Sequence, residues 1–271
     1  MDRRHLAGLA RRGLTVGLSA AQRADYEANG FILIKGLLSA EEATFYRAEV
    51  HALDARQGET NATWASVKGD TELSHSHDVH FKSAAFTRLL VDPRLTAIAQ
   101  DLIGPNVQLH HNKMFIKPPE KGSPFPMHQD YPYFPHRDHS MIAAILHFDD
   151  APADRGCLCV YPGSHKRGPL PAHGADHHVC TDEFPLAGAT RIEAEAGDAI
   201  FFHYLLVHGS GLNTSAEPRT TLLIQMRDPT DMPLNDRHAS RGQGMMLAGI
   251  DPQQAAFRFA WDQSTDGSER T

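Results

Sequence analysis

The chain is organised around the stretch Pro126-Met127-His128-Gln129-Asp130-Tyr131, which reads as a short extended strand. Side chains alternate between the two faces of a strand, so His128 and Asp130 point the same way and Gln129 points the opposite way. An imidazole and a carboxylate on one face supply two ligands of a 2-His-1-carboxylate triad, which binds non-haem iron and leaves positions open. Because such pairs also arise by chance, the motif needs a third ligand, a cosubstrate site and a scaffold from the rest of the chain.

The scaffold around this motif is rich in short segments with β-branched and aromatic residues, separated by Pro, Gly, Asn and Asp. We predict strands at residues 107–117, 125–131, 141–149, 156–161, 191–195, 198–203, 205–210 and 219–228. A double-sheet jelly roll uses eight strands. The pattern therefore predicts a β-sandwich.

Helices are predicted upstream of this block. Ser19 and Ser39 each open a capping box, and Asp92-Pro93 begins a third helix that Gly104-Pro105 ends. A short strand is expected at residues 31–36, and residues 56–82 read as polar and irregular. We thus predict one mainly β domain with α-helices over residues 1–271: a helical layer at about 19–104, a jelly-roll core at about 106–228 and a C-terminal extension at 229–271.

Composition restricts the classes of partner. The 271 residues carry a formal net charge of -7, which argues against nucleic acid or a polybasic membrane surface. No apolar run approaches the roughly 20 residues that a membrane helix needs. The three cysteines are too few for a disulfide framework, and the N-terminal residues lack the apolar segment of a secretory signal. We expect a cytoplasmic protein that acts on a small molecule. A mitochondrial transit segment at residues 1–12 is the alternative, and the oligomeric state is left open.

Two histidines compete for the third ligand position. His208 ends an apolar strand just before Gly209 and Gly211, where the backbone can lie close to a ligand. His203 precedes a bulky turn and is equally compatible with a hydrogen-bonded core histidine. The local sequence favours His208.

Arg219 opens the strand 219–227, and alternation places it on one face with Thr221, Leu223 and Gln225. A buried guanidinium needs an anion, and its planar fork suits a carboxylate. One alternative is a structural ion pair with Asp198 or Glu217. The other is the distal carboxylate of a 2-oxoglutarate cosubstrate.

Together these residues form a pattern that resembles the phytanoyl-CoA dioxygenase family of Fe(II)/2-oxoglutarate oxygenases. The matching stretches begin with Asn29-Gly30-Phe31 and continue through Lys117-Pro118-Pro119, Pro126–Asp130, Tyr133–Pro135, Gly156–Leu158, Pro162–Lys166, Gly197-Asp198, Phe201–His203, Leu206–Asn213 and Arg219. The resemblance spans about residues 19–228.

The resemblance implies a double-stranded β-helix, the cupin-like jelly roll. It implies iron at His128, Asp130 and His208, with Arg219 at the distal carboxylate of 2-oxoglutarate and Ser210 assisting. The implied cofactors are Fe(II), 2-oxoglutarate and O₂, and the implied reaction hydroxylates an aliphatic C–H bond while releasing succinate and CO₂. The family pattern also includes an upstream lysine directed at the cosubstrate, and the nearest region here, residues 77–81, contains none.

Asp130 bears on the type of reaction, because halogenating relatives carry a small residue in place of the carboxylate; its presence favours hydroxylation. Two other classes remain open, a non-redox cupin-type metal enzyme such as an isomerase and a non-catalytic metal-binding protein. The family implies an acyl-CoA, an amino-acid derivative, a phosphonate or a natural product as substrate. Cations flanking the motif either meet an anionic substrate or lie on the surface: Lys113, Lys117, Lys121 and Arg137. The loop 173–178 is read as a solvated loop or a lid.

Overall fold

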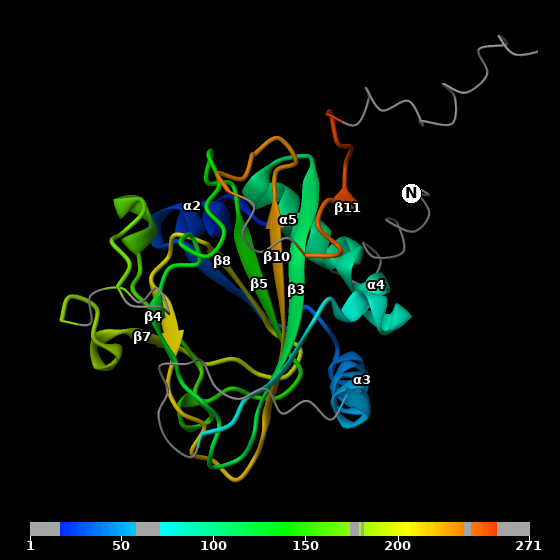
Figure 1. Ribbon diagram of the computed structural model, residues 1–271, viewed down its shortest axis with the longest axis vertical. Helices are drawn as coiled ribbons and strands as arrows, with labels where there is room; N and C mark the ends of the chain where they lie inside the picture. The colour runs from blue at the N-terminus through cyan, green and yellow to red at the C-terminus, as the bar shows by residue number, and fades with distance from the viewer. Residues whose placement is uncertain (1–16, 58–70, 174–178, 180–181, 236–239, 254–271) are drawn as a thin grey trace, which may run out of the picture.

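The protein folds into two facing antiparallel sheets with helices on one side (Figure 1). The computed structural model describes residues 17–57, 71–173, 179, 182–235 and 240–253. The larger, seven-stranded sheet has the order β1-β8-β5-β10-β3-β11, with β2 also paired to β3, and the smaller sheet has the order β4-β9-β6-β7. The strands are β1 (Phe31–Ile34), β2 (Ser74–His77), β3 (Val107–Lys117), β4 (Phe125–His128), β5 (Ile142–His147), β6 (Leu158–Val160), β7 (Thr190–Ile192), β8 (Ala199–His203), β9 (His208–Ser210), β10 (Arg219–Arg227) and β11 (Met246–Ala248).

The predicted jelly roll is confirmed, and each of the eight predicted segments overlaps one of the strands β3 to β10. The expectation of irregular structure throughout residues 56–82 is wrong, because β2 lies there and pairs with β3. Its sequence, Ser-His-Ser-His, has no apolar alternation that would mark a strand. The short strand β11 in the C-terminal extension was also not expected. Both pair with an edge that only the folded sheet provides.

In the described part of the chain, four α-helices precede or flank the sheets: α2 (Ala20–Asn29), α3 (Ala40–Gln57), α4 (Ala84–Leu90) and α5 (Pro93–Ile103). The three predicted helices are confirmed, and α4 is an addition. At the start of α2 the Ser19 hydroxyl accepts from the Gln22 amide at 3.2 Å, while the Gln22 side chain accepts from the Ser19 amide at 2.9 Å. Two otherwise unpaired amides are thereby satisfied. The helix ends at Gly30, whose φ of 82° favours glycine.

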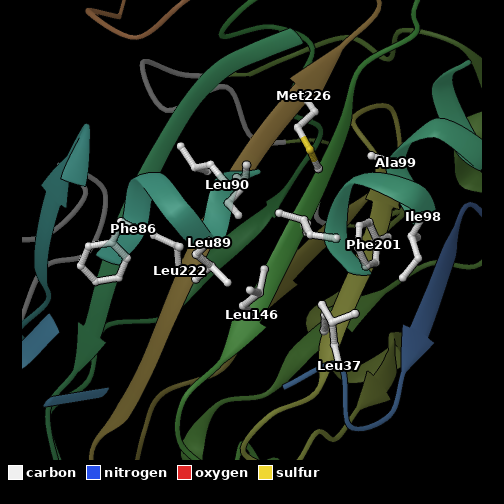
Figure 2. Packing of buried hydrophobic residues seen from close by; sticks show 14 of the residues in the cluster. Leu37, Phe86, Leu89, Leu90, Ile98, Ala99, Leu146, Phe201, Leu222 and Met226 are labelled. Atoms are coloured by element: carbon white, nitrogen blue, oxygen red, sulfur yellow. The ribbon is translucent and has the colours of Figure 1, made fainter. Parts of the chain in front are cut away.

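The outer face of the larger sheet carries the main hydrophobic core. Figure 2 shows α4 and α5 residues lying over alternate side chains of the central strands. Their contacts involve Phe86, Leu89, Leu90, Ile98 and Ala99 from the helices with Leu146, Phe201, Leu222 and Met226 from the sheet. Since side chains alternate along a strand, covering this face with helices directs the residues in between toward the smaller sheet.

A cavity of about 400 Å³ lies on that inner face. The four β10 residues predicted to share a face all line it: Arg219, Thr221, Leu223 and Gln225. The basic segment 1–12 and most of the loop 173–178 fall outside the described residues. No described helix combines the length and the apolar character needed to cross a membrane.

Candidate metal and cosubstrate site

The predicted triad residues lie together at the cavity. β4 and β9 pair so that His128 and His208 are register partners, with ring centroids 4.3 Å apart. Asp130 follows β4 and is held by its amide, which donates to the Tyr204 carbonyl at 2.9 Å. Its Oδ1 lies 3.5 Å from His128 Nε2 and 3.7 Å from His208 Nε2. Two ligand atoms that each lie about 2.1 Å from one metal ion, at right angles, are about 3 Å apart. The three side chains therefore need to move only slightly closer together to bind one ion.

The protonation of both imidazoles follows from their backbone contacts. His128 Nδ1 lies 2.7 Å from the Pro126 carbonyl and His208 Nδ1 lies 2.9 Å from the Leu206 carbonyl. A carbonyl oxygen only accepts, so each Nδ1 carries the proton and donates it. Nε2 is then the nitrogen that each ring presents to a metal. Burial, together with His128, lowers the pKa of His208 to about 4.

Asp130 is oriented from the opposite sheet. The side-chain amide of Gln225 on β10 donates to Asp130 Oδ2 at 2.6 Å, which leaves Oδ1 facing the histidines. Burial raises the pKa of Asp130, but the nearby His208 and His128 and the bond from Gln225 outweigh it, so the pKa lies below its usual value. The carboxylate is thus kept ionised, which is the form that ligates metals.

Gly209 permits the close pairing of the two ligand-bearing strands. A Cβ at this position would lie 2.6 Å from the Phe125 carbonyl oxygen and 2.8 Å from Met127 Sδ. Only glycine leaves room for β4 against β9 there. A Cβ at Gly211 would have no other atom within 4 Å. Of the two glycines after His208, Gly209 is therefore the one that the close approach requires.

His203, the competitor for the third position, lies at the end of β8 and outside the triad. Its Nδ1 accepts from the Leu205 amide at 3.1 Å, and its ring packs 5.5 Å from that of His165. Within the described ranges, His128, Asp130 and His208 form the single cluster whose ligand atoms all lie within 4.8 Å of one another.

Arg219 stands at the other end of the cavity. One terminal nitrogen donates to the Gly156 carbonyl, and its buried Nε has no hydrogen-bond partner among the residues described. The alternative of an ion pair with Asp198 or Glu217 is wrong. Asp198 pairs with Lys35 at 2.8 Å, and Arg219 makes no ion pair with Glu217, which is among the described residues. Burial lowers the pKa of Arg219 to about 10. An unpaired buried guanidinium fits an anionic ligand.

Lys117 lies beside Arg219, as its register partner on β3. Its buried Nζ donates to Ser210 Oγ and to the Gly211 carbonyl, both at 2.7 Å. Burial, reinforced by Arg219, places the pKa of Lys117 well below its usual value. A lysine therefore does lie near Ser210, but it comes from β3 and not from residues 77–81. The sequence had indicated Lys117 as part of a matching stretch and as one of the cations flanking the motif.

His147 on β5 is a cavity residue that sequence reasoning missed. It is fully enclosed, its Nδ1 makes no hydrogen bond within the described part of the chain, and it lines the cavity with Arg219. Burial, with Arg219 adding to it, lowers the pKa of His147 to about 3. The alternation of side chains along the predicted strand 141–149 places His147 on the same face as Ala143. This pattern could have predicted the face on which His147 lies.

The four flanking cations separate into two groups. Lys113 lines the cavity and Lys117 is buried at its end, whereas Lys121 and Arg137 are exposed and lie near Glu72 and Asp138. The arrangement as a whole combines two bare imidazole nitrogens and one carboxylate oxygen with buried cations a short distance along the same cavity.

The comparisons with known proteins agree with this geometry. Residues 26–221 match the family described as phytanoyl-CoA dioxygenase (PhyH). The chain is 33% identical over 223 residues to the peroxisomal phytanoyl-CoA dioxygenase of Rattus norvegicus, covering 72% of this chain and 64% of that protein. It is 33% identical over 227 residues to the ectoine dioxygenase of Halomonas elongata, covering 75% and 68%.

Among solved structures, the chain is similar to the epimerase SnoN in complex with Fe3+, alpha ketoglutarate and nogalamycin RO. The TM-score is 0.66 at 26% identity, with 91% of this chain and 98% of that chain covered. The match to the rat protein spans less than two thirds of its length. The family match covers most of the present chain and includes the triad, Lys117 and Arg219. By this match, the protein belongs to the phytanoyl-CoA dioxygenase family.

Proposed function

We propose that this protein is a non-haem Fe(II)- and 2-oxoglutarate-dependent dioxygenase that hydroxylates an aliphatic C–H bond of a small molecule and releases succinate and CO₂. The observation that carries the proposal is the pairing of two sites in one cavity. One end presents three converging metal-ligand atoms, and the other presents buried cations that pair with no carboxylate in the described structure. A metal and an anionic cosubstrate account for both ends.

In this proposal His128 Nε2, Asp130 Oδ1 and His208 Nε2 hold the iron. Their second atoms are engaged by the Pro126 carbonyl, Gln225 and the Leu206 carbonyl, so the ligand atoms need no reorientation when the ion binds. A metal ion held by these three residues would keep positions free for a cosubstrate and O₂. Bound iron supplies the activation of O₂ and the oxidative decarboxylation of 2-oxoglutarate.

The chain's remaining contributions are binding and exclusion of water. Arg219 binds the distal carboxylate of 2-oxoglutarate through its unpaired Nε, with Ser210 as a second donor once Lys117 has fixed the hydroxyl. Aromatic and aliphatic side chains line the cavity between the two ends, among them Phe115, Phe125, Tyr133 and Phe202. Such walls keep water from the reacting centre.

The geometry gives the rival functions less support. A non-redox cupin-type isomerase or a metal-binding protein without catalysis has no use for the buried cations at the Arg219 end. Phytanoyl-CoA and ectoine, for which the curated relatives are named, are small molecules, which supports a small-molecule substrate here. The buried free thiols of Cys157 and Cys159 support a reducing compartment such as the cytoplasm.

The proposal is tested by following succinate formation from 2-oxoglutarate with purified protein, Fe(II) and O₂, alone and with a library of small molecules. Turnover is expected to require iron and O₂, and coupled products gain the mass of one oxygen atom. Asp130→Ala is expected to abolish turnover, while the exposed Asp138→Ala keeps it. Full activity of Asp130→Ala, or turnover that is independent of iron, contradicts the proposal.

A further inference from the structure

A third set of polar side chains lines the cavity, on β2 and β3. β2 pairs with β3 so that His77 and Lys113 are register partners, and the His77 and His111 rings lie 6.3 Å apart. All three line the cavity. We call His77, His111 and Lys113 the β2–β3 corner.

Lys113 is the cation of this corner and lacks an anionic partner. Its ammonium lies 4.9 Å from the centre of the Phe115 ring, and it makes no ion pair or hydrogen bond with any described residue. Asp78, which follows His77 and lines the cavity, accepts from the Ser240 hydroxyl at 3.1 Å. Burial lowers the pKa of Lys113 to about 8. A cation that is half-buried, unpaired and directed into a cavity is stabilised by an anion that enters the cavity.

Lys113 acts electrostatically on β2, where its charge helps to lower the pKa of His75. Along β3, Lys113 and Lys117 are four residues and therefore about 13 Å apart. The four C–C bonds of 2-oxoglutarate, each about 1.5 Å long, span much less than this. A carboxylate bound at Arg219 and Lys117 thus lies several residues along the strand from Lys113, whose charge is left for a second acidic group.

The space between the corner and the triad is apolar and limited. Phe115, Tyr133 and Phe134 line it, and about 400 Å³ is near the lower end of ligand cavities. The enclosed part of the second molecule is therefore compact and has an apolar body.

We propose that the β2–β3 corner, with Lys113 as its cation, binds an acidic group, a carboxylate or a phosphate, of the molecule that is hydroxylated. The substrate is then a compact acid whose apolar body presents its C–H bond to the metal while its acidic end contacts Lys113. This inference rests on the proposed function, and it makes Lys113 a specificity-determining residue.

Binding is measured in protein loaded with Zn(II) and 2-oxoglutarate, because zinc occupies the triad without redox chemistry. The probes are short carboxylic acids, alkyl phosphates of matching chain length and the methyl esters of the same acids, with thermal stabilisation as the readout. Acids or phosphates are expected to stabilise the wild-type protein and Lys113→Arg, and the uncharged esters to stabilise neither. Whether carboxylates or phosphates stabilise more identifies the acidic group.

Lys113→Met removes the charge at nearly constant length, and the exposed Lys121→Met is the matched control. Loss of a charged hydrogen bond is expected to weaken acid binding about 10- to 100-fold in Lys113→Met, with 2-oxoglutarate affinity unchanged within about twofold. Lys121→Met is expected to match the wild type.

Three results overturn the inference. The esters bind as well as their acids, or no acid or phosphate stabilises the wild-type protein. The third is that Lys113→Met weakens the binding of 2-oxoglutarate and leaves the binding of the acid unchanged. If Lys113→Met does not fold, the acid and ester comparison on the wild-type protein and Lys113→Arg still decides. Failure of the proposed function gives a different result from failure of this inference. If the proposed function is wrong, the protein forms no succinate with Fe(II), whether or not a second substrate is present.

Discussion

Gln225 donates a 2.6 Å hydrogen bond to Asp130 Oδ2 across the cavity, although the two residues lie 95 positions apart in the chain. The bond joins the smaller sheet's ligand-bearing segment to the central strand of the larger sheet. It also decides which carboxylate oxygen faces the histidines. The metal site is therefore a product of both sheets.

Gln225→Leu is expected to lower metal affinity roughly 10- to 100-fold, because the carboxylate loses the partner that orients it. Titration of the metal-free protein with Fe(II) or Co(II) measures the change. Gln100→Leu on α5 is the control, since Gln100 bonds only the nearby Pro105 carbonyl. Equal metal affinity in the two variants would show that Gln225 does not position Asp130.

Arg219→Lys is expected to raise the KM for 2-oxoglutarate about 10- to 100-fold with little change in metal affinity. Lysine keeps the charge but loses the planar fork and the Nε donor that faces the cavity. Calorimetric titration of 2-oxoglutarate into the zinc-loaded variant measures the corresponding change in Kd without turnover. Arg137→Lys, on the exposed surface, serves as the control, and an unchanged KM in Arg219→Lys argues against a cosubstrate role.

Gly209→Ala is expected to destabilise the protein by about 1–3 kcal/mol, since the new Cβ meets the backbone of β4. Gly211→Ala, two residues away with open space around it, is expected to stay within about 0.5 kcal/mol of wild type. Thermal and urea unfolding of both variants make the comparison. Similar stabilities would mean that β4 and β9 adjust without strain.

The buried His147 predicts a pH dependence of stability. Its pKa in the folded protein is about 3 against an ordinary 6.5, so between these values the unfolded chain binds a proton that the folded protein does not. The stability is complete above about pH 6.5 and decreases as the pH falls. At pH 5 this single group lowers the free energy of unfolding by about 2 kcal/mol.

His147→Asn is expected to remove the part of the pH-dependent loss of unfolding free energy that His147 causes. Urea unfolding of metal-free protein at pH 7 and pH 5 measures it, and the exposed His173→Asn should keep the wild-type dependence. A loss in His147→Asn as large as in the wild type would contradict the assignment.

The sequence by itself determined the strand block, the helix starts and the direction of the side chains on the central strands. Local chemistry suffices for these features: apolar alternation for β10, side-chain capping for α2, and Pro, Gly and Asn for the turns. The spacing of His128 and Asp130 predicted that the two side chains converge, although Asp130 lies beyond the end of β4. The third ligand required a choice between His203 and His208. Gly209, directly after His208, favoured His208.

Tertiary structure alone decided which polar groups are buried without a partner. Lys113 and Lys121 are equivalent in sequence terms, yet only Lys113 lines the cavity, because β2 and β10 flank it on both sides of β3. The same holds for Gln225 beside Asp130 and for the pairing of Lys117 with Ser210. Such contacts join residues about 90 positions apart. They depend on sheet register and packing, which no local pattern of residues encodes.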